Sequence, residues 1–479
     1  MIRSGLLLGL CLIAGLALGL GRELLIVSRW GTSGETDALL VALFIPEAIR
    51  TTFGAGLISA AATNLWLDHR SKSSASAWLR TQSTAFLIVA ISVGALLALA
   101  SGLVVRVIGP GLSTANASLA GETLGVLVWC LPGVFLHALL SVVHQAEQRF
   151  ALPGLGSLFF NLPAVLYLVL LKDQATFHNL ALALVFGSIL MAVVLMPGAW
   201  RHGWRPFLPT VQFALVTPLI AKLMPLGLGA TASQATVLLE RVLGSFLPEG
   251  SIAVLNLGRK LLGLPAVAIT SLGQIALSRF ANEIHSNSSN EAVCILRQSL
   301  VRLCIVSFPI ALGLSLWAPQ AAALILLGGS EKIDSLASVI RFLAIGLIPS
   351  GLNVVLARYC YAYGDTRSPT ILEFFGIVSQ ISAALILFSM VGLISLPLAS
   401  TIGIFTTTLL LLRLAPDGLR KSHWAIVMVA QGGVVLLLSH AVRFPLEMPG
   451  WLAIVEGCLL CVVLWSAMWL GARKLRLLG

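Results

Sequence analysis

Arginine and carboxylate residues occur within long apolar stretches of this sequence. Arg22, Glu23 and Arg29 lie in the first stretch, and Arg50 lies in the second. A charged side chain at the centre of a bilayer costs about 2.5–3.5 kcal/mol on insertion scales, so such residues usually face a partner or a water-filled cavity. The guanidinium group of Arg binds phosphate oxygens through two parallel hydrogen bonds. The pattern therefore predicts a cleft that binds an anionic, phosphate-bearing group.

Equivalent helices of the two halves of the chain carry these charges, so we expect them to converge on one cleft. The charged residues concerned are Arg22, Glu23, Arg29, Asp37, Glu47, Arg50, Lys222, Glu240, Arg241, Arg259 and Lys260. Basic residues are in excess among them. A structural alternative stays open, in which Arg22–Glu23 and Glu240–Arg241 are ion pairs that hold helices together. For Arg29 and Arg241, near helix ends, extension of the side chain to the interface is the favoured alternative.

Two prolines lie inside predicted spans, and glycines follow each of them. Pro46 precedes Gly54, and Pro265 precedes Gly273. Such residues bend membrane helices and open them around a cavity. Their recurrence at equivalent positions predicts a shared hinge, although tolerated kinks would give the same pattern.

A second group of polar residues lies near the end of the second half. Glu373, Ser379, Gln380 and Thr401 supply a carboxylate, hydroxyls and an amide that could hold Na⁺ or a proton. Packing between helices through small polar groups is the favoured alternative. No other cofactor is expected.

The composition requires a membrane to position these residues. The chain has 479 residues, of which 58% are hydrophobic and only 10% charged, whereas soluble domains are about 25% charged. A span needs roughly 20 apolar residues. We predict an all-α membrane protein of about fourteen spans, at 4–29, 35–66, 79–108, 118–145, 153–171, 176–198, 211–247, 251–282, 295–327, 333–362, 369–392, 394–414, 422–443 and 449–472.

Basic residues in the connections predict the orientation. One side collects most of them, including Arg70, Arg149, Arg201 and Arg420, whereas Lys172 is among the few on the other. Because cytoplasmic loops are rich in Lys and Arg, both termini are predicted to be cytoplasmic, in a bacterial inner membrane.

An internal repeat appears when the sequence is shifted by 219 residues without gaps. Arg22 then meets Arg241, Gly31 meets Gly250, and Pro46 meets Pro265. We therefore predict two six-helix bundles, 1–205 and 206–415, around a central cavity, and two extra helices in 416–479. Two bundles around a cleft are a plan typical of transporters.

Several other classes of function lack their sequence signals. The net charge of +11 is not gathered into the basic runs of nucleic-acid-binding proteins. No nucleotide-binding Walker A motif, nucleophile elbow or zinc-ligand motif is present. The seven cysteines lie in or beside apolar stretches and indicate no disulfide framework.

The stretch from Gly21-Arg22-Glu23 through Thr36-Asp37-Ala38, Ile45-Pro46 and Arg50 resembles the opening of the MurJ/MviN family of lipid II flippases. Gly258-Arg259-Lys260 with Leu264-Pro265 is similar to a second segment of that family. The resemblance implies the fold of the multidrug/oligosaccharidyl-lipid/polysaccharide exporters and a transporter, not an enzyme. It implies alternating access that moves an undecaprenyl-diphosphate-linked saccharide to the outer leaflet. The family's cavity arginines carry over to Arg22, Arg50 and Arg259, and its acidic residue to Asp37.

The sequence departs from the family pattern at two positions. The family has Ser-Arg where this chain has Gly15-Leu16, and it commonly has Glu where this chain has Ala55. The alternatives that stay open are a flippase for an exopolysaccharide or O-antigen unit and, less favoured, a multidrug exporter. The expected partners are the polyprenyl-diphosphate-linked saccharide and membrane lipids, with no nucleic acid. The protein is expected to be a monomer near cell-wall or polysaccharide enzymes, with 416–479 as a groove for the lipid tail.

Overall fold

The computed structural model describes residues 2–72, 74–205, 213–285, 289–326, 332–416, 419, 421–441 and 450–474. These residues form helices and short connections, without a strand, as the sequence predicts for an all-α protein. The chain divides into two compact units, Met1–Ala253 and Val254–Gly479.

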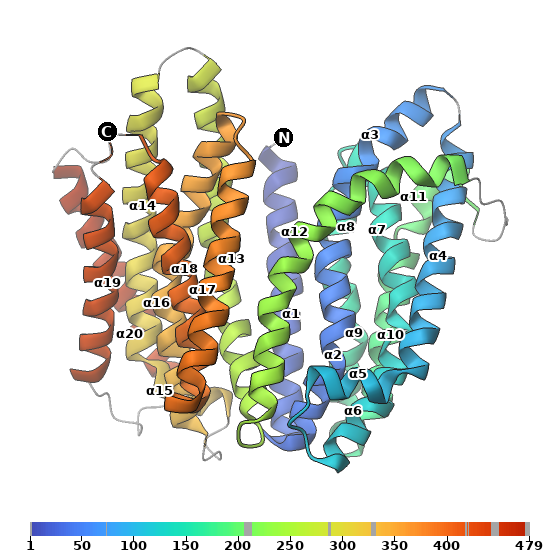
Figure 1. Ribbon diagram of the computed structural model, residues 1–479, viewed down its shortest axis with the longest axis horizontal. Helices are drawn as coiled ribbons and strands as arrows, with labels where there is room; N and C mark the ends of the chain where they lie inside the picture. Colours follow the sequence, from blue (N-terminus) through green and yellow to red (C-terminus); the bar gives the residue numbers. More distant parts are fainter. Residues whose placement is uncertain are drawn as a thin grey trace. The chain divides into compact units, whose positions relative to one another are not determined.

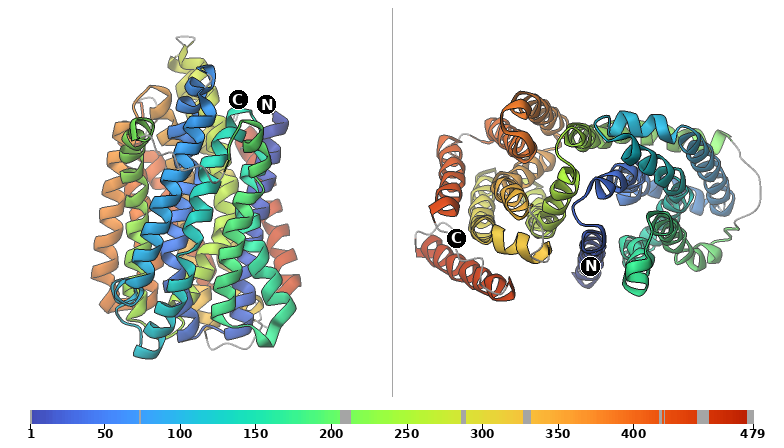
Figure 2. Two further views of the ribbon diagram at one scale, coloured as in Figure 1. Left: turned by 90° about the vertical axis from the view of Figure 1, so that its right-hand side faces the viewer. Right: turned by 90° about the horizontal axis from the view of Figure 1, so that it is seen from below.

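The described residues of unit 1 form twelve α-helices of very different length and two short irregular ones (Figure 1). They are α1 (Ile2–Trp30), α2 (Gly34–Ile49), the π-helix η1 (Arg50–Leu57), α3 (Ile58–Ser71), α4 (Ala75–Leu99), α5 (Ser101–Ile108), α6 (Thr114–Leu127), α7 (Cys130–Ala146), α8 (Ala151–Gly154), α9 (Gly156–Leu171), the 3₁₀ turn η2 (Lys172–Gln174), α10 (Phe177–Val193), α11 (Met196–Arg201) and α12 (Phe213–Ser245). The long helices of this unit run side by side, as the left view of Figure 2 shows.

Unit 2 consists of long helices and two short ones. They are α13 (Ser251–His285), whose first residues belong to unit 1, α14 (Ser289–Leu316), α15 (Ala318–Ile325), α16 (Ile333–Ala362), α17 (Arg367–Val391), the 3₁₀ turn η3 (Gly392–Ile394), α18 (Ser395–Leu414), α19 (Lys421–Ala441) and α20 (Gly450–Lys474). A core that includes Leu312, Trp317, Ile348 and Val435 joins α14, α16 and α19.

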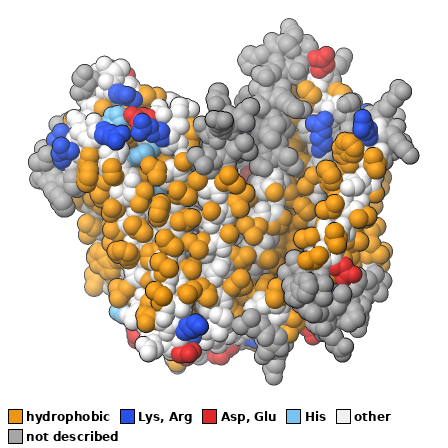
Figure 3. Space-filling view, turned by 180° about the vertical axis from the view of Figure 1, so that it is seen from behind, with side chains coloured by type: hydrophobic (Ala, Val, Ile, Leu, Met, Phe, Trp, Pro, Cys, Tyr) orange, Lys and Arg blue, Asp and Glu red, His pale blue; other side chains and the backbone are white. Residues whose placement is uncertain are grey.

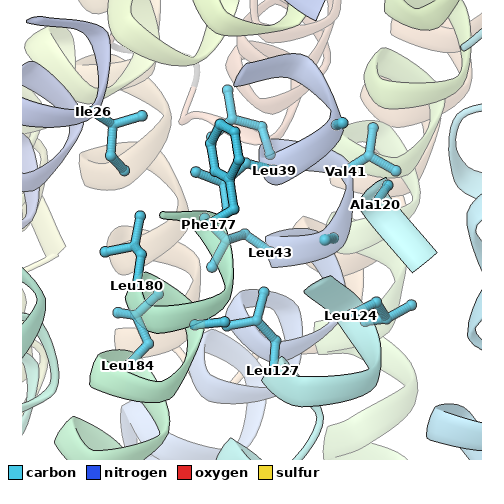
Figure 4. Close-up of a cluster of buried hydrophobic side chains, with 14 of the residues drawn as sticks. Ile26, Leu39, Val41, Leu43, Ala120, Leu124, Leu127, Phe177, Leu180 and Leu184 are labelled. Carbon is cyan, nitrogen blue, oxygen red and sulfur yellow. The ribbon is translucent and has the colours of Figure 1, made fainter. Parts of the chain in front are cut away.

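Two apolar cores stabilise unit 1. The first joins α1, α2, α6 and α10 through residues such as Ile26, Leu39, Leu124 and Leu180 (Figure 4). The second core joins α3, α4, α7 and α11, and it includes the buried rings of Trp66, Trp78 and Trp204. Along the α2–η1–α3 helix, the segment that carries Glu47 and Arg50 lies between the parts that enter these two cores. A polar level, the segment that carries Glu47 and Arg50, therefore lies between two apolar cores along this helix.

Apolar side chains also cover the outside of unit 1. In the left part of Figure 3, which is unit 1 seen from behind, they form a broad band, and basic and histidine side chains gather at its upper margin. Lys72 and Arg149 in connections of unit 1, and Arg70 and Arg201 in the last turns of α3 and α11, are exposed. A broad apolar band beside a basic margin is the surface expected of a membrane-spanning unit.

Eight helical stretches of the described residues are long and apolar enough to cross a membrane, or nine if the bent pair α6–α7 counts as one span. One of the eight, Arg367–Leu414, comprises both α17 and α18. In α19 and α20 the apolar segments among the described residues are shorter, Ile426–Ser439 and Val455–Leu470. The chain is thus a multi-pass membrane protein, and the number of fourteen spans stays a prediction.

Irregular backbone positions recur along the chain at nearly the predicted repeat distance. Gly31 and Gly250 both have positive φ, and so do Gln148 and Gly364, as well as Lys172 and Gly392. Lys172 and Gly392 each begin a 3₁₀ turn, η2 and η3. The pairs are separated by 216 to 220 residues. This recurrence supports the predicted repeat, while the division into 1–205, 206–415 and 416–479 stays a prediction.

Candidate functional site

A fully buried guanidinium group lies at the centre of the polar level of unit 1. Arg22, on α1, is 0% exposed. Its Nη1 donates to Asn161 Oδ1 at 3.0 Å, and its Nη2 donates to Glu47 Oε1 at 2.8 Å and to Glu23 Oε1. Arg22 therefore connects α1 to α2 through the Glu47 carboxylate and to α9 through the Asn161 amide. This arrangement matches the ion-pair alternative more closely than an open anion site.

Arg50 has the same side chain in different surroundings. Its guanidinium carbon lies 4.8 Å from the centre of the Phe160 ring, and its Nη1 is 3.5 Å from Ser157 Oγ, which is the limit of a hydrogen bond. Glu47 is an electrostatic neighbour, but no carboxylate of the described residues forms an ion pair with Arg50. A guanidinium held mainly by an aromatic face and a weak hydroxyl contact retains N–H donors for a ligand.

The backbone around Arg50 departs from α-helical geometry. Pro46 has no N–H to donate within α2, and the eight residues from Arg50 to Leu57 form the π-helix η1. The Thr51 hydroxyl donates to the carbonyls of Glu47 and Ala48. Such π-helical segments are frequent at functional sites. The predicted hinge residues Pro46 and Gly54 thus border or lie within an irregular segment.

Arg241, on α12, is also buried, with 8% exposure. It interacts electrostatically with Glu47 and Glu240 and, more weakly, with Glu23 and Asp37. Together with Arg22 and Arg50, this makes three arginines beside four carboxylates in unit 1. Carboxylates therefore outnumber arginines among these seven residues: Glu23 and Glu47 pair with Arg22, and Glu47 and Glu240 act on Arg241.

Asp37 forms a helix cap. Both of its carboxylate oxygens accept backbone hydrogen bonds, Oδ2 from Gly250 N at 2.6 Å and Oδ1 from Ala253 N at 2.8 Å. Gly250 directly precedes α13 and Ala253 lies in its first turn, where a helix has unsatisfied donors and a positive dipole end. Asp37 thus links the start of α2 to the start of α13, and both of its carboxylate oxygens accept backbone hydrogen bonds there.

Arg29 lies near the end of α1 and stabilises a turn. Its Nη2 donates to the carbonyl oxygen of Asp173 at 2.6 Å, and its guanidinium lies 5.9 Å from the Trp30 ring. Trp30 in turn stacks on Phe177, with 4.4 Å between ring centres. This position fits the alternative in which Arg29 reaches the interface.

Lys222, on α12 of unit 1, is exposed. Two further basic candidates lie in unit 2. Arg259 and Lys260 are both on α13 and partly exposed. Pro265 and Gly273 lie in the same α-helix, which continues unbroken to His285. The side-chain surroundings of Gly54, Ala55 and Gly273 lie outside the described part of the structure.

The residues of the predicted cation site have separate partners. Ser379 Oγ lies 3.0 Å from Thr406 Oγ1, and the Thr401 hydroxyl donates to the carbonyls of Phe342 and Pro397. Glu373 is exposed and is an electrostatic neighbour of Tyr361. The Gln380 side chain packs at Gly403. These contacts match helix packing, and no group of three or more His, Cys, Asp or Glu residues that could hold a metal is found among the described residues.

Gly15 and Leu16, where the sequence differs from the family pattern, lie on α1 in the structure. A Cβ atom at Gly15 would lie 2.8 Å from Ser157 Cβ, so α1 and α9 are in close contact there. Leu16 is 37% exposed. An apolar side chain therefore occupies the position at which the family has a second arginine on α1.

The sequence did not identify Asn161 as part of the site. Asn161 is buried in α9 and accepts from Arg22, while its own amide donates to Ser157 O at 2.8 Å. A single Asn within an apolar span is the signal that would have pointed to it. Ser157, Phe160 and Asn161 share one helix face by spacing, and this face contacts Arg22 and Arg50.

Comparison with known proteins decides what kind of protein carries this cluster. The family described as "Lipid II flippase MurJ" matches residues 26–451. The chain belongs to the MurJ lipid II flippase family. Curated MurJ relatives include a "Probable lipid II flippase MurJ" from Thermotoga maritima, 24% identical over 88% of this chain and 87% of the relative. The "Lipid II flippase MurJ" of Burkholderia cenocepacia is 24% identical over 84% of this chain and 80% of its own length.

Solved structures support the same fold. A MurJ structure described as an inward closed conformation covers 99% of this chain and 100% of its own, with a TM-score of 0.83 and 20% sequence identity. An outward-facing multidrug transporter of the MATE family and MOP superfamily aligns with a TM-score of 0.58 over 92% of this chain and 96% of its own, at 15% identity. The predicted resemblance to MurJ, the fold class and the assignment to transporters rather than enzymes are confirmed.

Proposed function

We propose that this MurJ-family protein flips lipid II from the inner to the outer leaflet of the bacterial cytoplasmic membrane by alternating access. The observation that carries the proposal is the match of the family model to residues 26–451, nearly the whole chain. Lipid II is a polyprenyl diphosphate joined to a saccharide, so its recognition requires donors for a diphosphate. Arginine residues in a membrane protein supply such donors without changing protonation.

Arg50 is the best-placed residue of unit 1 for this contact. Its guanidinium is held by the Phe160 ring and the Ser157 hydroxyl, whereas Arg22 is occupied by Glu23 and Glu47. We assign Arg22 to positioning, because it holds Glu47 one helical turn before Arg50. Arg259 and Lys260, and more weakly Arg29, Asp37 and Arg241, remain proposed contributors to substrate binding.

The alternative substrates receive less support. The curated relatives from Thermotoga maritima and Burkholderia cenocepacia carry the name lipid II flippase, so an exopolysaccharide or O-antigen unit is not favoured. The multidrug transporters align with lower TM-scores than MurJ. The proposal further places both termini in the cytoplasm. It also holds that the protein is a monomer and lies near cell-wall enzymes.

Complementation tests the substrate. The intact chain is expressed in cells depleted of their own lipid II flippase, and growth is the expected outcome. The Arg50→Ala variant should fail to support growth at equal membrane abundance, whereas Arg106→Ala, a change at an exposed residue of α5, should support it. Lysis of cells that express the unchanged chain well would contradict the proposal.

A further inference from the structure

One face of α9 contacts both Arg22 and Arg50. The guanidinium carbon of Arg50 lies 4.8 Å from the centre of the Phe160 ring, and Arg50 Nη1 lies 3.5 Å from Ser157 Oγ. One residue after Phe160, Asn161 Oδ1 accepts from Arg22 Nη1 at 3.0 Å. The two arginines therefore contact neighbouring residues of one helix, but the partners that they find there differ in kind.

Glu47 is the carboxylate nearest to Arg50 along the chain. Arg50 N donates to the Pro46 carbonyl, as in an α-helix. Side chains three residues apart on such a backbone are neighbours. Glu47 Oε1 nevertheless accepts from Arg22 Nη2 at 2.8 Å, and no ion pair joins Glu47 to Arg50 within the described residues. Arg50 thus stays apart from a carboxylate that lies one helical turn away.

A carboxylate and an aromatic ring affect a guanidinium group differently. A carboxylate can accept hydrogen bonds from two of its N–H groups and neutralises its charge. An aromatic face attracts the cation through the quadrupole of the ring and does not cancel its charge. Arg50 on the Phe160 ring therefore keeps its charge and most of its N–H donors, and an anion site requires both.

Close packing fixes the position of this ring. Phe160 is 1% exposed and belongs to the first apolar core of unit 1. A side chain at Gly187, on α10, would collide with the Phe160 carbonyl, so α9 and α10 lie in close contact at this level. A ring in a close-packed core has little freedom to move. Arg50 therefore rests on a fixed surface.

We propose that Phe160 is a positioning residue for substrate binding: its ring holds the Arg50 guanidinium away from Glu47, so that Arg50 stays available to a diphosphate. The inference rests on the proposed function, in which Arg50 contacts that diphosphate. Asn161 assists from the same face of α9, because it binds Arg22, and Arg22 in turn pairs with Glu47. Without the ring, Arg50 would turn to Glu47 and lose charge and donors for the substrate.

Binding of farnesyl diphosphate to the full-length protein, measured by calorimetry, tests this role. Phe160→Leu keeps an apolar side chain but removes the aromatic face. It should weaken binding by roughly 3- to 30-fold, the range that corresponds to loss of a desolvated cation–π contact. The matched control is Phe159→Leu, the same substitution one position earlier, where the side chain packs against the core. It should bind as the unchanged protein does.

A second background separates positioning from a general structural effect. Glu47→Gln removes the competing charge, while its amide oxygen can still accept from Arg22. Glu47→Gln should bind at least as tightly as the unchanged protein, and adding Phe160→Leu to it should change the affinity by less than about twofold. Non-additivity of this kind measures the coupling between Phe160 and Glu47. A merely structural role of the ring would give the same loss in both backgrounds.

The outcomes separate this role from the proposed function. An equal loss in both backgrounds, or no loss in Phe160→Leu, overturns the positioning role and leaves the flippase proposal intact. Loss of binding in Glu47→Gln also overturns it, because Glu47 would then contribute to the site instead of competing for Arg50. Absence of binding to the unchanged protein overturns the diphosphate site at Arg50 as well. If thermal unfolding shows that Phe160→Leu does not fold, Phe160→Met replaces it under the same criteria, because the flexible Met side chain fills irregular gaps.

Discussion

At the scale of single residues, surroundings separate two arginines that the sequence treats alike. Arg22 and Arg50 both interrupt apolar stretches, and both carry over from the family pattern. Arg22 is enclosed by Glu23, Glu47 and Asn161, whereas Arg50 rests on the Phe160 ring. A guanidinium already paired with two carboxylates has few N–H donors left for an anion. The two residues should therefore respond differently to substitution.

Replacement of Arg50 should weaken substrate binding and leave the fold intact. Arg50→Ala removes charge-assisted hydrogen bonds that are typically worth about 1.5–3 kcal/mol, or roughly one to two decades in affinity. Arg50→Lys should restore only part of this loss, because an ammonium group lacks the planar fork. Binding of farnesyl diphosphate and thermal unfolding of the same samples provide the measurements. Unchanged affinity in Arg50→Ala would remove Arg50 from the site.

Replacement of Arg22 should instead destabilise unit 1. Arg22→Ala leaves the buried Glu23 and the partly buried Glu47 without the cation that they share, and breaking such a buried pair typically costs about 3–5 kcal/mol. The double variant Arg22→Ala/Glu47→Gln should recover part of the loss, because one of the two charges is gone. Chemical unfolding in detergent measures both. A fully stable Arg22→Ala protein that cannot bind substrate would show that Arg22 is a ligand and not a counter-ion.

The sequence was sufficient to identify the arginines but not their partners. The free-energy cost of burying a charged side chain follows from its residue type and from the apolar residues around it in the sequence. Arg22, Arg50 and Arg241 could therefore be recognised directly as candidate site residues. Asn161 is 139 residues from Arg22, and such a contact depends on how α1 packs against α9. The balance between arginines and carboxylates could not be predicted for the same reason.

At the scale of helices, irregular positions mark where the chain can change direction or bend. The repeat, the prolines and the positive-φ glycines Gly31 and Gly250 were readable because these residue types have restricted backbone roles. The π-helix η1 could not be predicted in this way, because it packs against α7, and such a contact between distant segments is not visible in the sequence. The cap that Asp37 provides for α13 also joins segments that are more than 200 residues apart.

Loss of that cap should fray the start of α13. Asp37→Ala removes acceptors for Gly250 N and Ala253 N, and loss of a cap typically costs about 0.5–2 kcal/mol. Asp37→Asn retains one oxygen acceptor and should cost less. Hydrogen exchange of the backbone around 250–255 measures the fraying directly. Equal protection in Asp37→Ala and in the unchanged protein would show that the cap does not stabilise this turn.

At the scale of the whole molecule, composition and charge distribution predict a membrane protein, and the structure adds where the margins of unit 1 lie. Arg70, Arg149 and Arg201 are exposed at connections on one side of the predicted spans, and Lys172 and Asp173 are exposed at the connection between α9 and α10 on the other. Charge alone assigns the basic margin to the cytoplasm, because Lys and Arg are retained there during insertion.

Labelling of single cysteines tests this orientation. In a background from which the seven native cysteines have been removed, Ser71→Cys and Arg201→Cys mark the basic margin, and Gln174→Cys marks the opposite one; all three positions are exposed. A thiol reagent that cannot cross membranes should label Gln174→Cys in intact spheroplasts, and it should label the other two only after the membrane is opened. Membrane abundance of each variant controls for insertion. The reverse labelling pattern would invert the predicted topology.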